Sequence, residues 1–430
     1  MNFIKIRDIS TLPMVLLFFS YILYYQIYAA SLASYTLAFK ILVLFICGLY
    51  SIFHINFKKL TNGGVIPLIG VFCYIIFLFV SSVGSVNSLY SLVQAGLQVG
   101  LLISACAFGQ YLVVHRGSKA LNVMMIIYFF IVLGSVFGGL FGLKEMYSIE
   151  GGIKRFNGMY GEPSLLGLTS GALVGFALFN VKHKKYQFII VAVALISLVL
   201  SGSRGMLLSV VLSLLGIGLL LFKIDQKTRY KLIGGILLII ILIVAAFVHN
   251  PQHLRSGSLS KLSGRTELWS KAVPNAMGRL TGFGYCLGGT AFNPNLNEVG
   301  SIYMPRHKFD MFERSTFKAA LHNGYVQALA DLGIIGFSFY LLIFLTGIKK
   351  AIREVELKDS RLFCFFIFFF ALANMTESVI MSPTSSSGLL FWVSWFFLIN
   401  NNRGILHERE SSHCTSENPS LSRGTVYSVV

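Results

Sequence analysis

The sequence predicts an all-α polytopic membrane protein with about 12 transmembrane helices and one large, partly helical outer loop. Of its 430 residues, 55% are apolar and only 12% are charged, and the mean hydropathy is +0.73. Soluble proteins carry about 25% charged residues, so an ordinary soluble domain is excluded. Apolar runs that can cross about 30 Å of hydrocarbon recur along the chain. The predicted spans are 12–29, 36–54, 65–83, 91–114, 121–143, 164–181, 187–202, 205–222, 232–249, 324–348, 361–382 and 388–400.

Basic residues predict the orientation of these spans. Lysine and arginine occur before the first span and in every second loop after it, whereas the loops at 30–35, 84–90 and 383–387 carry none. Because basic loops stay in the cytoplasm, both termini are expected inside and the alternate loops outside. The N-terminus imitates a secretory signal, but its cleavage would break this alternation, so the first span is expected to remain uncleaved.

The predicted spans divide the chain into six segments, of which the large loop 249–321 is the longest polar one. A loop of this length needs structure of its own or a function. We expect a helix near GRTELWSKAV, a Gly-rich turn at GFGYCLGG, and a helix that restarts near His322. The segments are 1–143 (helices 1–5), 144–163 (outer loop), 164–248 (helices 6–9), 249–321 (large outer loop), 322–400 (helices 10–12) and 401–430 (a disordered cytoplasmic tail).

The large outer loop has an excess of positive charge, with nine Lys or Arg residues against four Asp or Glu residues. This excess favours an anionic partner, although a solvated basic face or attraction to lipid headgroups would account for it equally well. The net charge of +18 mostly reflects the cytoplasmic bias of membrane proteins and does not indicate nucleic acid. The sequence contains no P-loop, no dinucleotide fingerprint and no paired acidic motif, which disfavours ATP-driven transport and cytosolic nucleotide-sugar chemistry.

Two arginines are candidates for binding an anion. Arg204 lies at the outer tip of an apolar hairpin, in SGSRGM. An arginine at the centre of a spanning helix costs roughly 2.5–3.5 kcal/mol, and less near the interface, so it is either functional or simply reaches the headgroups. Arg265 starts the expected loop helix, with Trp269 one turn later. The guanidinium group of Arg265 could bind phosphate oxygens bidentately, or Arg265 could be an exposed residue on an amphipathic helix.

Polar residues at two expected helix starts are candidates for acid–base chemistry. His322 and Asn323 begin the span ALHNGYVQALADLGIIG, where an imidazole could take a proton from a hydroxyl, or the pair could cap the helix. Glu162 in GEPS precedes Pro163 at an expected helix start. Its carboxylate could act as a base or accept a hydrogen bond from a sugar hydroxyl. Alternatively, it is an ordinary acidic residue at the start of a helix. Arg155, just upstream, could help to gather an anion.

Other polar residues indicate no metal or disulfide site. Asp331 and Glu377 lie within or near apolar spans and are assigned no role. Cys286 is the one cysteine in the large outer loop, so neither a disulfide framework nor a cysteine metal site is expected. His249 and His253 are four residues apart, but Pro251 breaks a helix that would align them. We therefore expect no metal and no cofactor.

Four motifs in order resemble the bacterial O-antigen ligase and polymerase superfamily over roughly residues 150–350. An SRG follows an apolar span, R-x-x-x-W opens the large loop, a G-x-G turn follows, and HN-x-Y-x-x-x-L-x-x-x-G-x-x-G starts the next span. Each motif is loose, but their order on this topology is fairly specific. The matching residues are Ser203–Gly205, Arg265 and Trp269, Gly282–Gly284, and His322, Asn323, Tyr325, Leu329, Gly333 and Gly336.

The resemblance implies a metal-independent glycosyltransferase in the bacterial inner membrane, with its active site facing the periplasm. Its donor would be an oligosaccharide linked to undecaprenyl pyrophosphate, and a flippase and a chain-length regulator would be possible partners. By this resemblance Arg204 and Arg265 would hold the pyrophosphate, and His322 would assist the acceptor hydroxyl. Glu162 is a second catalytic candidate, and secondary substrate contacts are expected from Arg155, Asn323 and Tyr325.

The acceptor distinguishes two activities within this superfamily. A polymerase transfers the glycan to another lipid-linked repeat unit, whereas a ligase transfers it to the lipid A core. The segment GMYGEPS resembles the GxxxEPS feature of repeat-unit polymerases, which favours a polymerase, although the HN signature is shared with ligases. A flippase or transporter is the alternative from another class, but the repeated halves common in transporters are not evident in the sequence.

Overall fold

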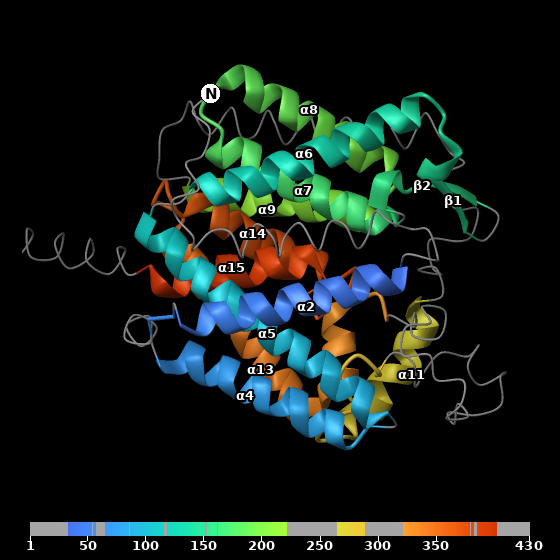
Figure 1. The fold of residues 1–430 in the computed structure, drawn as a ribbon, viewed down its shortest axis with the longest axis vertical. Helices are drawn as coiled ribbons and strands as arrows, with labels where there is room; N and C mark the ends of the chain where they lie inside the picture. Colours follow the sequence, from blue (N-terminus) through green and yellow to red (C-terminus); the bar gives the residue numbers. More distant parts are fainter. Residues whose placement is uncertain are drawn as a thin grey trace, which may run out of the picture.

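A computed structural model describes residues 33–53, 55–56, 65–85, 87–115, 118–150, 153–160, 162–221, 265–288, 321–378, 380–381 and 385–401. These segments form a bundle of apolar helices, with β1, β2 and α11 at one end of it (Figure 1). The helices are α2 (Ala33–Ile52), α4 (Val65–Val83), α5 (Ser88–His115), α6 (Ser118–Leu140), α7 (Pro163–Asn180), α8 (Lys184–Leu200), α9 (Arg204–Leu220), α11 (Arg265–Met277), α13 (Gly324–Glu354), α14 (Arg361–Ala373) and α15 (Ser386–Asn400).

The described helices match the class of fold expected from hydropathy. Among the described residues, five helices are long and apolar enough to cross a membrane: α4, α5, α6, α7 and α13. Shorter apolar helices include α9, α14 and α15. The predicted spans 12–29 and 232–249 lie outside the described residues, so the predicted number of about 12 stays a prediction. The chain is a multi-pass membrane protein.

The core of the bundle is built around α15. Its residues Ser386–Ile399 are buried on every side, because α5, α13 and α14 all pack against it. A helix that is apolar all round belongs inside a large bundle or a membrane. Trp395 donates a hydrogen bond of 2.8 Å from its indole Nε1 to the Ile343 carbonyl of α13, so the indole nitrogen is satisfied within this core. These contacts fix α13 against α15.

The outer helices expose large apolar side chains. Phe45 of α2, Phe72 of α4, Phe130 of α6 and Phe188 of α8 are each more than half exposed. Such a density of exposed apolar groups is not compatible with a watery surface, because contiguous apolar patches on soluble proteins are small. These faces therefore meet the lipid.

One departure from the all-α expectation lies in the predicted loop 144–163. Here a short 3-10 helix, η1 (Lys144–Met146), leads into an antiparallel pair of strands, β1 (Tyr147–Glu150) and β2 (Ile153–Phe156), and a second 3-10 helix, η2 (Gly158–Tyr160). Phe156 is buried and its ring lies against Tyr147. The hairpin forms because this aromatic pair and Met146 pack on α6, where Gly138 and Gly139 leave room for them.

A second departure concerns the predicted span 361–382, in which α14 ends at Ala373. The reason is a competing set of hydrogen bonds at Asn374. Its carbonyl oxygen accepts a hydrogen bond from the backbone N–H of Gly324 at 2.7 Å, and its side-chain amide donates to the Tyr340 hydroxyl at 3.0 Å. The chain beyond Asn374 therefore leaves the helical path and forms a turn that carries Thr376 and Glu377.

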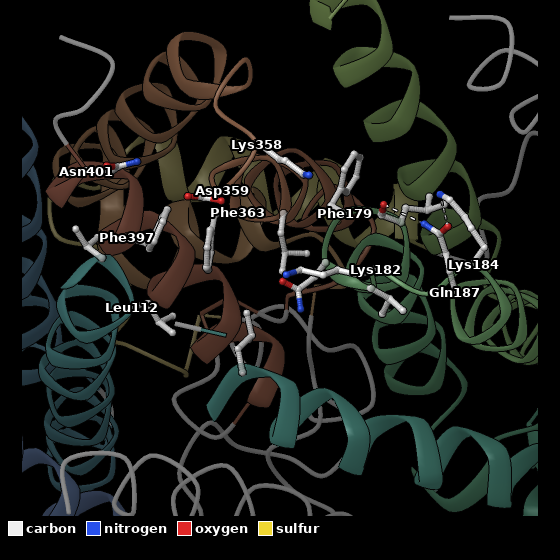
Figure 2. A pocket seen from close by; sticks show the side chains of 16 residues that line it. Leu112, Phe179, Lys182, Lys184, Gln187, Lys358, Asp359, Phe363, Phe397 and Asn401 are labelled. Atoms are coloured by element: carbon white, nitrogen blue, oxygen red, sulfur yellow. Dashed lines mark hydrogen bonds between the residues drawn. The ribbon is translucent and has the colours of Figure 1, made fainter. Parts of the chain in front are cut away.

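The two ends of the bundle differ in character. At one end, which we call the lysine end, a cleft of about 540 Å³ lies between the end of α5, the α7–α8 connection and the α13–α14 connection. Figure 2 shows Lys182, Lys184 and Lys358 at this cleft. The opposite end, which we call the loop end, carries the β-hairpin, the α8–α9 turn, residues 279–288 and the start of α13. The described parts of the loops that were expected inside and outside thus gather at opposite ends.

Candidate functional site

The turn between α8 and α9 presents Arg204 at the loop end. Gly202 adopts a positive φ of 63°, which glycine accommodates without strain, and this reverses the chain between two helices. The Ser201 hydroxyl oxygen accepts a hydrogen bond from the Ser203 N–H at 3.3 Å. Arg204 is the first residue of α9, and its side chain is exposed. The hairpin predicted from sequence, with the arginine at its tip, is confirmed.

Two glycines bring this turn against neighbouring helices. A Cβ atom on Gly205 would lie 2.7 Å from the Thr376 Cβ, and one on Gly167 of α7 would lie 2.8 Å from the Ser203 Cβ. Neither glycine has a positive φ, so close approach is what excludes a side chain at these positions. The Arg204 turn therefore lies between α7 and the turn that follows α14.

His322 faces the same turn after α14. Its Nδ1 lies 3.1 Å from the Glu377 Oε2, and the two side chains are 39% and 13% exposed. His322 has a positive φ of 48°, which is uncommon for residues other than glycine and indicates local strain that the surroundings must hold in place. The structure thus brings together the histidine, a carboxylate and, through Thr376, the turn that carries Arg204.

Backbone contacts on both sides hold His322 in place. After it, the Gly324 N–H donates to the Asn374 carbonyl at 2.7 Å, and a Cβ on Gly324 would lie 2.6 Å from the Asn374 Nδ2. Before it, the Leu321 carbonyl accepts a hydrogen bond of 2.7 Å from the Trp269 indole. The residues that flank His322 are thus tied to α14 on one side and to α11 on the other.

Asn323 and Tyr325 make structural hydrogen bonds. The Asn323 Oδ1 accepts from the N–H groups of Tyr325 and Val326 at 3.0 and 3.2 Å, so it caps α13, which was the alternative considered from the sequence. The Tyr325 hydroxyl donates to the Ala371 carbonyl at 2.9 Å. Both residues lie within the site, and the Asn323 Oδ1 and the Tyr325 hydroxyl are engaged by the protein.

Glu162 and Arg155 lie on the segment that enters α7. Glu162 precedes Pro163 at the start of α7 as expected, and its exposed carboxylate accepts a hydrogen bond of 3.2 Å from the Ser164 hydroxyl. Arg155 is half-buried on β2, opposite Ser148 of β1. Because Gly167 of α7 contacts the Ser203 turn, Glu162 enters at the same end as Arg204.

Arg265 is the first residue of α11, which confirms the helix expected at GRTELWSKAV. The side chain of Arg265 lies outside the described residues. Trp269, one turn later, donates a hydrogen bond from its indole Nε1 to the Leu321 carbonyl, so α11 docks on the protein beside His322.

The Gly-rich turn after α11 contacts α13. A Cβ on Gly282 would lie 2.5 Å from both the Asp331 carbonyl oxygen and the Gly333 N, so this turn packs backbone to backbone. Cys286, four residues later, is a free thiol. Burial raises its pKa well above the ordinary value, and the nearby Asp331 carboxylate raises it further. The thiol is therefore protonated at neutral pH and a poor nucleophile.

The cleft at the lysine end is separate from these residues. Its lining combines apolar side chains such as Phe179 and Phe363 with Lys182 and Lys358 (Figure 2). None of the residues predicted from sequence to act on a substrate lines it. The loop end, and not this cleft, is the candidate site.

Glu377 and Thr376 are residues of the site that the sequence did not assign. Glu377 was noted as an acid near an apolar span and given no role. The sequence feature that could have identified Glu377 is its position near the outer end of a long apolar run, where a carboxylate is costly without a polar partner. Its distance in sequence from His322 left that partner undefined.

These features define a polytopic helical membrane protein whose loop end carries arginine, histidine and glutamate side chains. Residues 189–341 match the family model described as O-antigen ligase. This match supports the resemblance to the O-antigen ligase and polymerase superfamily that the motifs indicated. The match implies a glycosyltransferase of polysaccharide biosynthesis that acts on a lipid-linked glycan. No curated protein matches the chain.

Proposed function

We propose that this protein polymerises oligosaccharide repeat units linked to undecaprenyl pyrophosphate. The reaction takes place at the periplasmic face of the bacterial inner membrane, which is the loop end of the bundle. The product is an O-antigen, capsular or exopolysaccharide. The observation that carries this proposal is the gathering of the Arg204 turn and the His322–Glu377 pair around one turn after α14.

In the proposed reaction, a hydroxyl of the acceptor sugar attacks the anomeric carbon of the donor. The new bond joins this carbon to the acceptor oxygen, and the bond to the phosphate oxygen breaks. His322 takes the proton of the hydroxyl through Nε2, because its Nδ1 side is occupied by Glu377. With Nδ1 protonated and donating to the carboxylate, Nε2 keeps its lone pair for the substrate.

The leaving pyrophosphate needs its growing charge stabilised. Arg204 is an exposed, permanently charged side chain at the N-terminus of α9, where the helix dipole also favours an anion. Arg265 begins α11, which docks beside His322 through Trp269. We propose that the two guanidinium groups hold the pyrophosphate from these two helix starts, because preorganised cations stabilise charge that develops in the transition state.

Glu162 and Arg155 complete the proposed site. Glu162 is exposed at the start of α7, close to the hairpin tip, where it could accept a hydrogen bond from a sugar hydroxyl. Glu162 and Ser164 belong to the GEPS sequence that favours a polymerase, and the Ser164 hydroxyl donates a hydrogen bond to the Glu162 carboxylate.

The alternative activity is that of a ligase, which the description of the matching family favours. The two activities share the donor and the proposed chemistry, and they differ in the acceptor. A gel of surface polysaccharide from a deletion strain separates them. A lost polymerase leaves a single repeat unit on the lipid A core, whereas a lost ligase leaves bare core and retained lipid-linked polymer. Undiminished surface polymer would overturn both.

A further inference from the structure

The outer segment 279–288 completes the backbone hydrogen bonds of α13. Gly333 has φ 70° and ψ −176°, which interrupts the helix and removes the helical partners around it. The Ile334 N–H donates instead to the Arg279 carbonyl at 3.1 Å, and the Ala330 carbonyl accepts from the Phe283 N–H at 2.9 Å. Unpaired backbone groups are costly at membrane depth, so the interrupted helix requires this segment.

The Asp331 carboxylate binds the backbone at the C-terminal part of segment 279–288. Its Oδ1 accepts from the Gly288 N–H at 2.7 Å and its Oδ2 from the Cys286 N–H at 3.1 Å. Gln327, one turn earlier on α13, donates to Oδ1 at 2.8 Å. Asp331 is fully buried, and its two carboxyl oxygens accept all three of these hydrogen bonds.

Gln327 extends this connection to the histidine. Its Oε1 accepts a hydrogen bond of 3.1 Å from the Leu321 N–H, the residue directly before His322. The Leu321 carbonyl in turn accepts from Trp269 of α11. A continuous path of hydrogen bonds therefore runs from the outer segment through Asp331 and Gln327 to the backbone beside His322.

We propose that Asp331 and Gln327 are positioning residues that hold the outer segment and the backbone of His322 in one fixed relation. This inference rests on the proposed function of the site. Both residues are buried within α13 and act through the peptide groups that they bind. Their role is to keep the strained His322 backbone aligned with the helix that begins at Arg265.

The same helix supplies a matched control. Glu354 is also buried on α13, at the lysine end, and its carboxylate accepts hydrogen bonds from Ser360 at 3.2 Å and Asn401 at 2.9 Å. Replacing Glu354 or Asp331 by the corresponding amide removes a buried carboxylate of the same helix in both cases. Of these two residues, only Asp331 is connected to the backbone beside His322. If Asp331 had a purely structural role, the two changes would have similar effects on the site.

The first test is backbone hydrogen exchange of the purified full-length protein in lipid nanodiscs. Asp331→Asn places an amide donor against one of the N–H groups of residues 286 and 288, so exchange should accelerate in 279–288 and also in 321–323. Gln327→Met should accelerate exchange in 321–323 through loss of the acceptor for Leu321. Glu354→Gln should leave both segments unchanged. Unchanged exchange at 321–323 in both site variants would overturn the coupling.

The second test is the rate of transfer from an undecaprenyl-pyrophosphate-linked repeat unit. Misalignment should lower kcat by about 10- to 100-fold while KM for the donor changes much less, because Asp331 and Gln327 do not contact the donor. Equal kcat losses in Asp331→Asn and Glu354→Gln would reduce Asp331 to a structural role. If the wild-type protein transfers nothing, the proposed function fails, and the exchange experiment still decides the coupling.

Discussion

The Nδ1 atom of His322 lies 3.1 Å from the Oε2 atom of Glu377, and this contact joins the start of α13 to the turn after α14. The glutamate is 13% exposed, so the carboxylate is largely withdrawn from water, which strengthens its hold on the imidazole. In the proposed reaction, a histidine oriented in this way presents its other ring nitrogen to the acceptor hydroxyl. The relation resembles the general arrangement in which an acid fixes the tautomer of a catalytic base.

We expect His322→Ala to lower the transfer rate by about 10²–10⁴-fold, the range for loss of a general base. Glu377→Gln keeps the shape of the side chain but loses its charge, and the transfer rate should fall by no more than in His322→Ala, with about 10⁴-fold as the upper limit. The double variant should be no slower than His322→Ala, because the glutamate acts through the histidine. Single-turnover kinetics would measure this. Losses that multiply in the double variant would contradict the pairing.

Arg204→Ala should reduce polymer formation by about 10²–10³-fold, the usual loss when one stabilising donor is removed from a transition state. Arg204→Lys should recover part of this, because lysine keeps the charge but not the bidentate fork. Arg353→Ala is the control, since Arg353 is exposed at the lysine end of α13. Polymer length on gels and protein amount in membranes are the measurements. Full-length polymer from Arg204→Ala would remove this arginine from the mechanism.

Gly205→Ala should displace the Arg204 turn from Thr376, because the new Cβ would lie 2.7 Å from both the Cβ and Cγ2 of Thr376. We expect a loss of activity together with a stability cost of about 1–3 kcal/mol, typical of overpacking. Adding Thr376→Gly removes the obstructing atoms and should restore part of both. Thermal denaturation in detergent and transfer assays measure the two effects. Failure of the second change to restore either would argue against this contact.

The orientation of the bundle can be measured with single cysteines, in a background where the six native cysteines are replaced by alanine. Met159→Cys lies at the loop end and Lys185→Cys at the lysine end, and both native side chains are exposed. A membrane-impermeant maleimide applied to spheroplasts should label Cys at 159, and label Cys at 185 only after the membrane is opened. The reverse pattern would place the proposed site in the cytoplasm.

Much of the architecture follows from local patterns. A membrane imposes one apolar environment along the whole of a span, so hydropathy predicted α4, α5, α6, α7 and α13 with small errors at their ends. The hairpin with Arg204 and the start of α7 at Pro163 followed from glycine, serine and proline chemistry close in the sequence. The β-hairpin and the early end of α14 did not, because aromatic packing on α6 and hydrogen bonds at Asn374 decide them.

The identity of the candidate residues was thus present in the sequence, since types such as Arg, His and Glu at the outer ends of apolar runs stand out there. Their arrangement was not. The pairing of His322 with Glu377 joins residues 55 positions apart, and the docking of Gly288 on Asp331 joins residues 43 apart. Contacts of this range depend on how α13 and α14 pack and on where glycines allow backbones to meet. That packing is a property of the folded bundle and has no counterpart in any local stretch of the chain.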